Sequence, residues 1–240
     1  MSFLKRIFQR IRFLNLTLKK DLSEISKRFP QYISYTEELL KGGATGVKKA
    51  RLGLTEIRPV EIVNVVDKFK PNSVLELGSG ASTILFLELL MSINKGSKFL
   101  SIDESEKWRD LTLLGINKFL PNRLNDFELR QSNKVETEYG TKYETEFDQI
   151  FDLVYIDGPT VALKDGEKLP CLDIQKIIES GFFPNIIMID GRLDTVDLIK
   201  KIASSKYDFH PSAIYHFRKT KNPFSILFTK YKRHSIFIKK

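Results

Sequence analysis

Residues 74–83, VLELGSGAST, place an acid and two glycines where an apolar run stops. Gly78 and Gly80 allow a tight turn and let the backbone approach a ligand closely. A second acid, Asp103, ends the next apolar run about 25 residues further on, where a carboxylate can accept hydrogen bonds from the two ribose hydroxyls of a nucleoside. The pattern favours a loop that binds a nucleoside-containing ligand over a plain strand-to-helix turn.

This loop differs from two common phosphate-binding loops. The dinucleotide fingerprint has a small third residue beside the pyrophosphate, and Thr83 stands there. A P-loop needs a lysine, and this loop has none. Glu76, just before the glycines, makes the loop acidic, which suits a ligand that carries positive charge and no phosphate.

Strand and helix patterns alternate from residue 55 onward. Runs rich in valine, leucine and isoleucine predict strands, and the runs between them predict helices, the first of which Ser82 or Thr83 can cap. Strands are expected at 73–77, 98–103, 127–132, 151–157 and 185–190, and helices at 55–71, 82–95, 104–120, 171–181 and 193–206. The tail, DFHPSAIYHFRKT and FSILFTKY, is expected to add two strands joined by a short turn.

Such alternation predicts an α/β fold with a doubly wound, mostly parallel sheet that is covered by helices on both faces. The two closing strands have no predicted helix between them, so one of them is expected to be antiparallel. Ligands bind such sheets beyond the carboxyl ends of the strands, near the point where the strand order reverses.

The N-terminal part has a different pattern. Apolar residues recur at helical spacing in residues 3–20 with basic residues between them, which predicts a basic amphipathic helix, and the glycine-rich residues 41–53 predict a flexible link. The chain is therefore expected to divide into a helical extension at 1–54 and one α/β domain at 55–240. The amphipathic helix could contact a membrane surface, but packing on the domain is favoured because such helices are common in globular folds.

Charge is unevenly distributed along the chain. Residues 1–70 hold 15 Lys and Arg against 7 Asp and Glu, residues 71–199 hold 13 against 22, and residues 200–240 hold 11 against 1. The basic ends favour an anionic partner, such as a phospholipid surface, an anionic glycan or nucleic acid. Nucleic acid is the least favoured of these, because no RNA-binding module of interleaved aromatic and basic residues is recognisable.

Composition also bears on the compartment. Cys171 is the only cysteine, so no disulfide can form within the chain, which fits a reducing compartment. No apolar run approaches the roughly 20 residues that a membrane-spanning helix needs, and the first residues lack the pattern of a signal peptide. These features predict a cytoplasmic protein, which could attach to the inner membrane face through residues 3–20.

The motifs together resemble a known family. The ExGxG sequence after the first strand, the acid after the second and FDLVYIDGP at the fourth resemble class I S-adenosylmethionine (SAM)-dependent methyltransferases over roughly residues 55–231. GSGAST, SIDES, YIDG and MIDGR resemble the small-molecule and sugar O-methyltransferase branch, and the Asn/Asp-Pro-Pro-Tyr motif of nucleic-acid methyltransferases is absent. The resemblance implies a Rossmann-like sheet of seven strands with an antiparallel closing strand, and SAM as the cofactor.

The resemblance also implies roles for matching positions. The glycine loop would surround the methionine end of SAM, and Glu76 would support that loop and the cationic groups of the ligand. Asp103, with Glu104 as the neighbouring alternative, would hold the ribose hydroxyls, and Ser132 and Asn133 would lie near the adenine. The implied cofactor-binding set is Glu76, Gly78, Ser79, Gly80, Ser82, Asp103, Glu104, Ser132 and Asp157.

Asp157 and Asp190 end the fourth and fifth predicted strands and are expected to face the same crevice. Methyl transfer is an in-line displacement that often requires removal of a proton, so both are candidate catalytic residues. In metal-dependent relatives, carboxylates at these places hold Mg²⁺, but Gly191 and Arg192 follow Asp190 here in place of a further acid or amide. Asp157 and Asp190 thus form an incomplete Mg²⁺ set, and Arg192 could instead bind an anionic group of the acceptor.

Two further features could contribute to the site. GPTVALKDGEKLP, residues 158–170, follows the fourth strand and predicts a substrate-binding lip whose two lysines favour an anionic substrate. His210 and His216 fall in the predicted closing hairpin, and His234 falls in the basic tail. A histidine could act as the general base, although the even spacing of the first two also fits a packed or exposed pair on one strand face.

The leading hypothesis is therefore a SAM-dependent methyltransferase that acts on a hydroxyl group of a small molecule or glycan. One alternative is a non-catalytic SAM-binding protein of the same fold. The others are an RNA methyltransferase and an NAD-dependent enzyme, the last of which Thr83 disfavours.

Overall fold

The computed structural model describes residues 21, 23–41, 57–94, 96–122, 126–220 and 234–240. The predicted amphipathic helix at 3–20, the predicted boundary at residue 54 and the predicted strand at 224–231 lie outside these ranges. In the described part of the chain, no helix has the length and apolar composition needed to span a bilayer.

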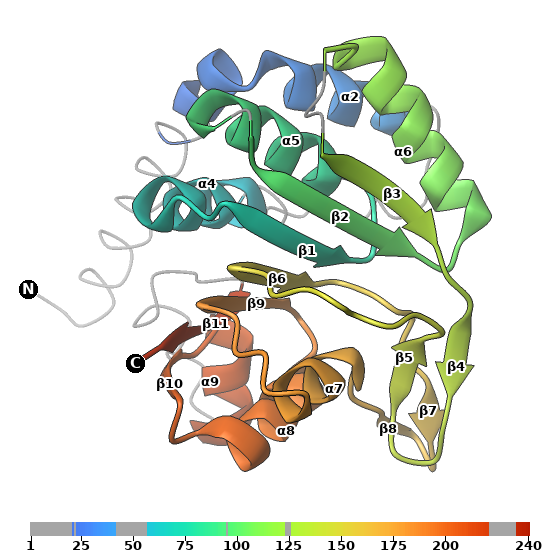
Figure 1. The fold of residues 1–240 in the computed structure, drawn as a ribbon, viewed down its shortest axis with the longest axis vertical. Coiled ribbons are helices and arrows are strands. Elements are labelled where there is room, and N and C mark those ends of the chain that lie inside the picture. Colours follow the sequence, from blue (N-terminus) through green and yellow to red (C-terminus); the bar gives the residue numbers. More distant parts are fainter. Residues whose placement is uncertain (1–20, 22, 42–56, 95, 123–125, 221–233) are drawn as a thin grey trace, which may run out of the picture.

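A seven-stranded sheet runs through the middle of the molecule (Figure 1). Every pairing is parallel except those of β11, which is antiparallel to both of its neighbours. The order is β3 (Phe127–Gln131), β2 (Lys98–Asp103), β1 (Ser73–Leu77), β6 (Leu153–Ile156), β9 (Ile186–Asp190), β11 (His234–Lys239) and β10 (Tyr207–His210). The expected doubly wound sheet with one antiparallel strand is confirmed, and its strand order reverses between β1 and β6.

Helices cover both faces of the sheet because the central strands are apolar on both sides. Alternate residues of each strand point to opposite faces, so Val74 and Tyr155 belong to one core cluster, while Leu75 and Ile156 belong to the other. The first face carries α2 (Pro30–Lys41), α4 (Ile57–Phe69), α5 (Ala81–Ile93) and α6 (Glu106–Phe119), and the second carries α7 (Asp173–Glu179), α8 (Leu193–Ala203) and α9 (Ala213–Thr220).

The described N-terminal residues belong to the first of these cores. Ile25, Phe29, Tyr35 and Leu39 are buried among the side chains of α4 and α5. The side chain of Glu88 on α5 accepts hydrogen bonds from the backbone amides at the start of α2. Part of the predicted extension is therefore integrated into the α/β core.

Two small hairpins were not expected from the sequence. The first joins β4 (Lys134–Glu136) to β5 (Thr141–Tyr143), and the second joins β7 (Leu163–Lys164) to β8 (Glu167–Lys168) within the predicted substrate lip. Asp165 and Gly166, the turn residues of the second hairpin, both have positive φ, as an Asp-Gly hairpin turn requires. This Asp-Gly pair was the sequence signal for the hairpin.

The prediction for the C-terminal tail is wrong in one respect. Residues 213–220 form helix α9, whereas the sequence pattern predicted that they continue a strand. Ser212 explains the helix, because its hydroxyl accepts a hydrogen bond from the amide of Tyr215 and so caps the first turn. The antiparallel strand of the described tail is β11, at residues 234–239.

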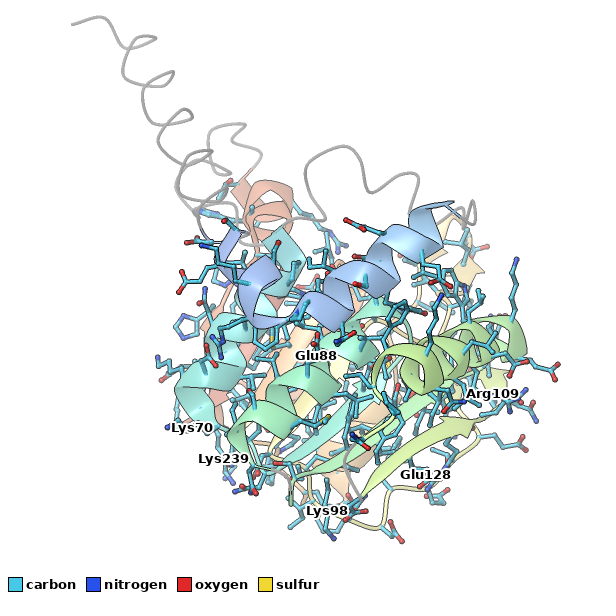
Figure 2. The ribbon with its side chains drawn as sticks, turned by 90° about the horizontal axis from the view of Figure 1, so that it is seen from above. Lys70, Glu88, Lys98, Arg109, Glu128 and Lys239 are labelled. Carbon is cyan, nitrogen blue, oxygen red and sulfur yellow. The ribbon has the colours of Figure 1, made fainter. Side chains whose placement is uncertain are left out.

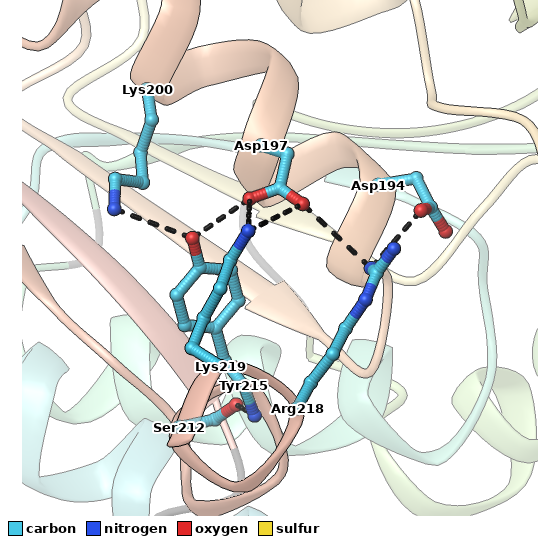
Figure 3. A network of polar contacts seen from close by, with 7 residues as sticks. All are labelled: Asp194, Asp197, Lys200, Ser212, Tyr215, Arg218 and Lys219. Atoms are coloured by element: carbon cyan, nitrogen blue, oxygen red, sulfur yellow. Dashed lines mark hydrogen bonds and ion pairs between the residues drawn. The ribbon is translucent and has the colours of Figure 1, made fainter. Parts of the chain in front are cut away.

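Polar contacts hold α9 against α8 (Figure 3). The hydroxyl of Tyr215 donates to Asp197 at 2.7 Å, and Arg218 pairs with Asp194 at 3.1 Å. Lys219 also pairs with Asp197, at 3.3 Å. These contacts hold α9, the helix that follows β10, against α8.

Candidate functional site

The loops that follow β1 and β6 are in backbone contact where the strand order reverses. Gly78 has a φ of +97°, and a Cβ atom there would lie 2.7 Å from the nitrogen of Gly158 and 2.9 Å from the carbonyl carbon of Asp157. Only glycine satisfies both the backbone conformation and this close approach. Gly80 differs, because a Cβ at this position would meet no atom within 4 Å.

Glu76 lies beneath the glycine loop and is fully buried. Its carboxylate accepts hydrogen bonds from the hydroxyls of Ser82 and Thr83 at 2.6 Å each and from Ser101 at 2.7 Å. Burial raises the pKa of Glu76 to about 7, even though these three bonds lower it. The acid thus ties β1 to β2 and to the start of α5, which supports the loop from inside.

The predicted helix cap is therefore different in the structure. Helix α5 begins at Ala81, with Gly80 in the capping position, and the hydroxyls of Ser82 and Thr83 point to Glu76. Thr83 also accepts a hydrogen bond from the amide of Gly80 at 2.9 Å. A chain of hydrogen bonds runs from Gly80 through Thr83 to the buried carboxylate.

Asp103, at the end of β2, bonds to the glycine loop at Ser79. Its Oδ2 accepts hydrogen bonds from the amide and hydroxyl of Ser79, at 2.7 and 2.9 Å, and its Oδ1 accepts one from the amide of Ser105 at 2.7 Å. Burial raises the pKa of Asp103, although these bonds oppose the shift. Asp103 therefore orients the loop and retains capacity for a further donor at Oδ1.

Glu104, which directly follows β2, bonds to two other segments, strand β5 and the loop after β6. It accepts hydrogen bonds from the hydroxyl of Tyr143 at 2.9 Å and from the amide of Thr160 at 2.7 Å, and the hydroxyl of Thr160 also donates to it. Burial would raise the pKa of Glu104, but these hydrogen bonds outweigh it and lower the pKa. These bonds join the end of β2 to hairpin β4–β5 and to the loop after β6, and Glu104, like Asp103, accepts three hydrogen bonds from the protein.

Two residues predicted near an adenine follow β3. The buried Ser132 donates its amide hydrogen to the carbonyl oxygen of Asp103 at 3.0 Å, which places it beside the acid that ends β2. Asn133 is exposed and its side chain contacts Glu144 instead.

Asp157 and Asp190 are neighbours across two parallel strands. Ile156 pairs with Ile189 in the register of β6 and β9, so each aspartate directly follows a residue of the same pair. Asp190 is 4% exposed, and Asp157 is partly exposed. The structure brings these two candidate catalytic carboxylates to the same edge of the sheet, as expected.

Arg192 crosses from the end of β9 to the end of β6. Its Nη2 donates to the carbonyl oxygen of Asp157, while Nε and Nη1 are buried and have no hydrogen-bond partner in the described part of the chain. A buried guanidinium with unmatched donors is costly, so a structure that retains one calls for an explanation.

The predicted Mg²⁺ site is not supported. Among the described residues, no group of three or more His, Cys, Asp or Glu side chains could hold a metal ion. Asp157 and Asp190 are adjacent, but neither belongs to such a group.

His234, which the sequence analysis placed in the basic tail, belongs to the sheet. It lies in β11 opposite Asp190 and is fully buried. Its Nδ1 lies 2.7 Å from Glu61 of α4, and its Nε2 lies 3.3 Å from the hydroxyl of Tyr155. A proton on Nδ1 lets His234 donate to Glu61 and accept from Tyr155.

The other predicted residues lie further out. Lys164 and Lys168 are exposed on the β7–β8 hairpin, where Lys164 lies 4.0 Å from Glu138. His210 ends β10, whereas His216 lies on helix α9, so the two do not share a strand face. Cys171 is buried, and burial raises the pKa of its thiol.

Comparisons with solved structures agree with this architecture. The chain is similar to the SAH-bound methyltransferase PaMTH1 of Podospora anserina, with a TM-score of 0.53 and 14% identity over 100% of this chain and 98% of that one. It is also similar to an O-methyltransferase of Bacillus cereus in complex with SAH, with a TM-score of 0.52 and 14% identity over 91% and 96% of the two chains. No family model and no curated protein matches the sequence. The chain therefore has the Rossmann-like fold of class I methyltransferases.

Proposed function

We propose that the chain is a SAM-dependent methyltransferase that acts on a hydroxyl group of a small molecule or glycan. The observation that carries the proposal is the glycine loop at the β1–β6 switch point, which the fully buried Glu76 and the β2 acid Asp103 hold from two sides. Ligands bind α/β sheets at such points.

The residues of this loop fit a SAM molecule. The open side of Gly80 permits close approach of a ligand, and Asp103 Oδ1 can accept a ribose hydroxyl in addition to the amide of Ser105. Ser132 lies beside Asp103 on the side proposed for the adenine. SAM, when bound, supplies an electrophilic methyl group.

The acceptor is proposed to bind beyond β6 and β9. There Asp157 and Asp190 are the carboxylates in position to accept the hydroxyl proton, which makes the oxygen a better nucleophile. The unmatched donors of Arg192 support an acceptor that carries an anionic group. The predicted lip, residues 158–170, is held to the end of β2 through Glu104 and borders this region.

Calorimetric titration tests the cofactor assignment. Wild type is expected to bind SAM and not NADH, and Asp103→Ala is expected to weaken SAM binding by about tenfold or more because it removes a charged hydrogen-bond acceptor. Asp126→Ala, which removes an exposed acid just before β3, is the matched control and should leave SAM binding unchanged.

Failure of folded wild-type protein to bind SAM would contradict the proposal. Binding without methyl transfer to any of a panel of hydroxyl acceptors would instead favour the non-catalytic alternative. Far-UV circular dichroism should show that both variants are folded.

A further inference from the structure

The amino ends of the strands carry a row of exposed lysines on the side of the sheet opposite the candidate site. Lys70 follows α4, Lys98 begins β2 and Lys239 ends β11, and Figure 2 shows these three along one side of the molecule. We name the full set the lysine edge; it consists of Lys68, Lys70, Lys98, Lys206, Lys239 and Lys240. All six are exposed.

These lysines differ from most other cations of the described chain in having few carboxylate partners. Lys98 lies 3.6 Å from Asp126, and none of the other five forms an ion pair with a described residue. Elsewhere, ion pairs engage Arg28, Arg109, Lys118, Arg130, Lys134, Lys164, Lys176, Arg218 and Lys219. Five of the six charges at the lysine edge therefore have no carboxylate partner among the described residues.

Acidic groups also lie on this side of the sheet and are partly engaged: Asp67, in the last turn of α4, pairs with Arg28, and Asp126 pairs with Lys98. Asp152 accepts hydrogen bonds from the amides of Asn72 and Ser73 and from the side chain of Asn185. Asp208, on β10, is exposed.

Helix dipoles explain only part of the row. Lys68 lies in the last turn of α4, and the amide of Lys206 bonds to the carbonyl oxygen of Ala203 at the end of α8, both places where a cation is favourable. Lys98 and Lys239, in contrast, are end residues of strands, which have small net dipoles. The ammonium groups of Lys206 and Lys239 lie over the ring of Phe183, at 5.6 and 6.0 Å from its centroid. Six like charges along one edge repel one another and favour an anionic partner.

The chemistry of the lysine edge favours a lipid surface over nucleic acid. Proteins that bind single-stranded nucleic acid stack bases on exposed aromatic rings and often use arginine. Here lysines lie over the rings of Phe183 and Phe69, the second at 4.8 Å, and the row contains no arginine. Lysine ammonium groups on flexible stems suit anionic lipid headgroups, each gaining on the order of 1 kcal/mol near such a surface.

We infer that the lysine edge is a docking surface for a membrane rich in anionic phospholipid. The inference stands apart from the proposed reaction, because it uses none of the residues at the carboxyl ends of the strands. It also fixes an orientation: with the lysine edge on the lipid, Asp103, Asp157 and Asp190 lie on the side away from the membrane.

Vesicle sedimentation with the full chain tests the inference. Wild type is expected to bind phosphatidylcholine vesicles that contain about one third phosphatidylserine, to bind pure phosphatidylcholine poorly, and to dissociate as salt rises. The double variant Lys206→Glu/Lys239→Glu is expected to bind the anionic vesicles at least about tenfold more weakly.

The matched control is Lys107→Glu/Lys168→Glu, which reverses two exposed lysines near the carboxyl ends of the strands that also lack an ion pair. It carries the same change in net charge and is expected to bind within about twofold of wild type. If Lys206→Glu/Lys239→Glu does not fold, Lys206→Gln/Lys239→Gln neutralises the same positions, and weaker vesicle binding is again expected.

Three outcomes would overturn the inference. The first is equal binding of wild type to neutral and anionic vesicles, and the second is equal loss of binding in the two charge-reversed variants. The third is binding of a single-stranded RNA of about 20 nucleotides in place of the anionic vesicles, which would assign the lysine edge to nucleic acid.

Discussion

Opposite ends of the strands carry opposite charges, and the protein compensates them differently. At the carboxyl ends, Glu76, Asp103 and Glu104 are wholly or partly buried, and each accepts three hydrogen bonds from groups within the protein. At the amino ends, the lysine edge is exposed and, apart from Lys98, has no ion-pair partner in the described part of the chain. A buried charge must be matched by the protein itself, whereas an exposed charge can be left to solvent or to a partner.

This difference implies unequal contributions to folding. The carboxyl-end acids organise loops that must keep one conformation, so substitutions there should change stability and ligand binding together. Substitutions at the lysine edge should leave stability nearly unchanged. Three measurements test this expected difference in stability between the two ends of the strands.

The largest effect is expected from Gly78→Ala. A Cβ there would lie 2.7 Å from the backbone of Gly158, and φ is +97°, so steric overlap adds to conformational strain and should cost about 3–5 kcal/mol. Gly181, which follows α7 toward the amino ends, has a similar φ of +83° but open space around a Cβ. Gly181→Ala should therefore cost only the strain, about 1–2 kcal/mol, in urea unfolding. Equal losses of unfolding free energy in the two variants would show that the contact between the loops after β1 and β6 contributes little to stability.

Glu76→Gln should change how stability depends on pH. The pKa of Glu76 is about 7 in the folded protein against an ordinary 4.5, so the folded state binds this proton more tightly than the unfolded state does. Its contribution to the free energy of unfolding therefore decreases as pH rises from about 4.5 to 7, by roughly 3 kcal/mol in total. The decrease in the free energy of unfolding between pH 5 and pH 8 should be smaller in Glu76→Gln than in wild type. An identical decrease in the two proteins would contradict the assignment of this pH dependence to Glu76.

The smallest effect is expected from neutralising the lysine edge. Lys206→Ala and Lys239→Ala each remove an exposed cation near the ring of Phe183, and the second also removes a hydrogen bond of 3.4 Å to the carbonyl oxygen of Phe183. Each should change the free energy of unfolding by less than about 0.5 kcal/mol. Thermal and urea unfolding measure this directly. A loss of 2 kcal/mol or more, roughly the size expected for a buried contact, would mean that these lysines serve the fold.

Much of the architecture could be predicted from local pattern. The five parallel strands and the helices between them follow from apolar runs, and strand-end position placed Glu76, Asp103, Asp157 and Asp190 at one edge of the sheet. Short elements were missed where a local polar signal outweighed the apolar pattern. Ser212 starts α9, and the Asp-Gly pair at 165–166 turns the β7–β8 hairpin.

Contacts between distant residues could not be predicted in the same way. Glu61 and His234 are 173 positions apart, and nothing in the spacing of either one identifies the other. The partners of Glu104, Tyr143 and Thr160, were likewise not foreseen, because both come from segments whose placement depends on the finished sheet. Such partners are selected by tertiary packing, which a single sequence does not display.

The position of β11 has a consequence for synthesis on the ribosome. This strand comes last along the described chain, yet it lies between β9 and β10, and among the described residues it is the only strand that pairs with β10. Until residues 234–239 emerge, the apolar strand IIMID (186–190) keeps one hydrogen-bonding edge open, and at 5–20 residues per second that interval is on the order of seconds. A nascent chain in this state presents a strand edge with which other chains can pair, and the pairing of residues 234–239 with β9 covers that edge.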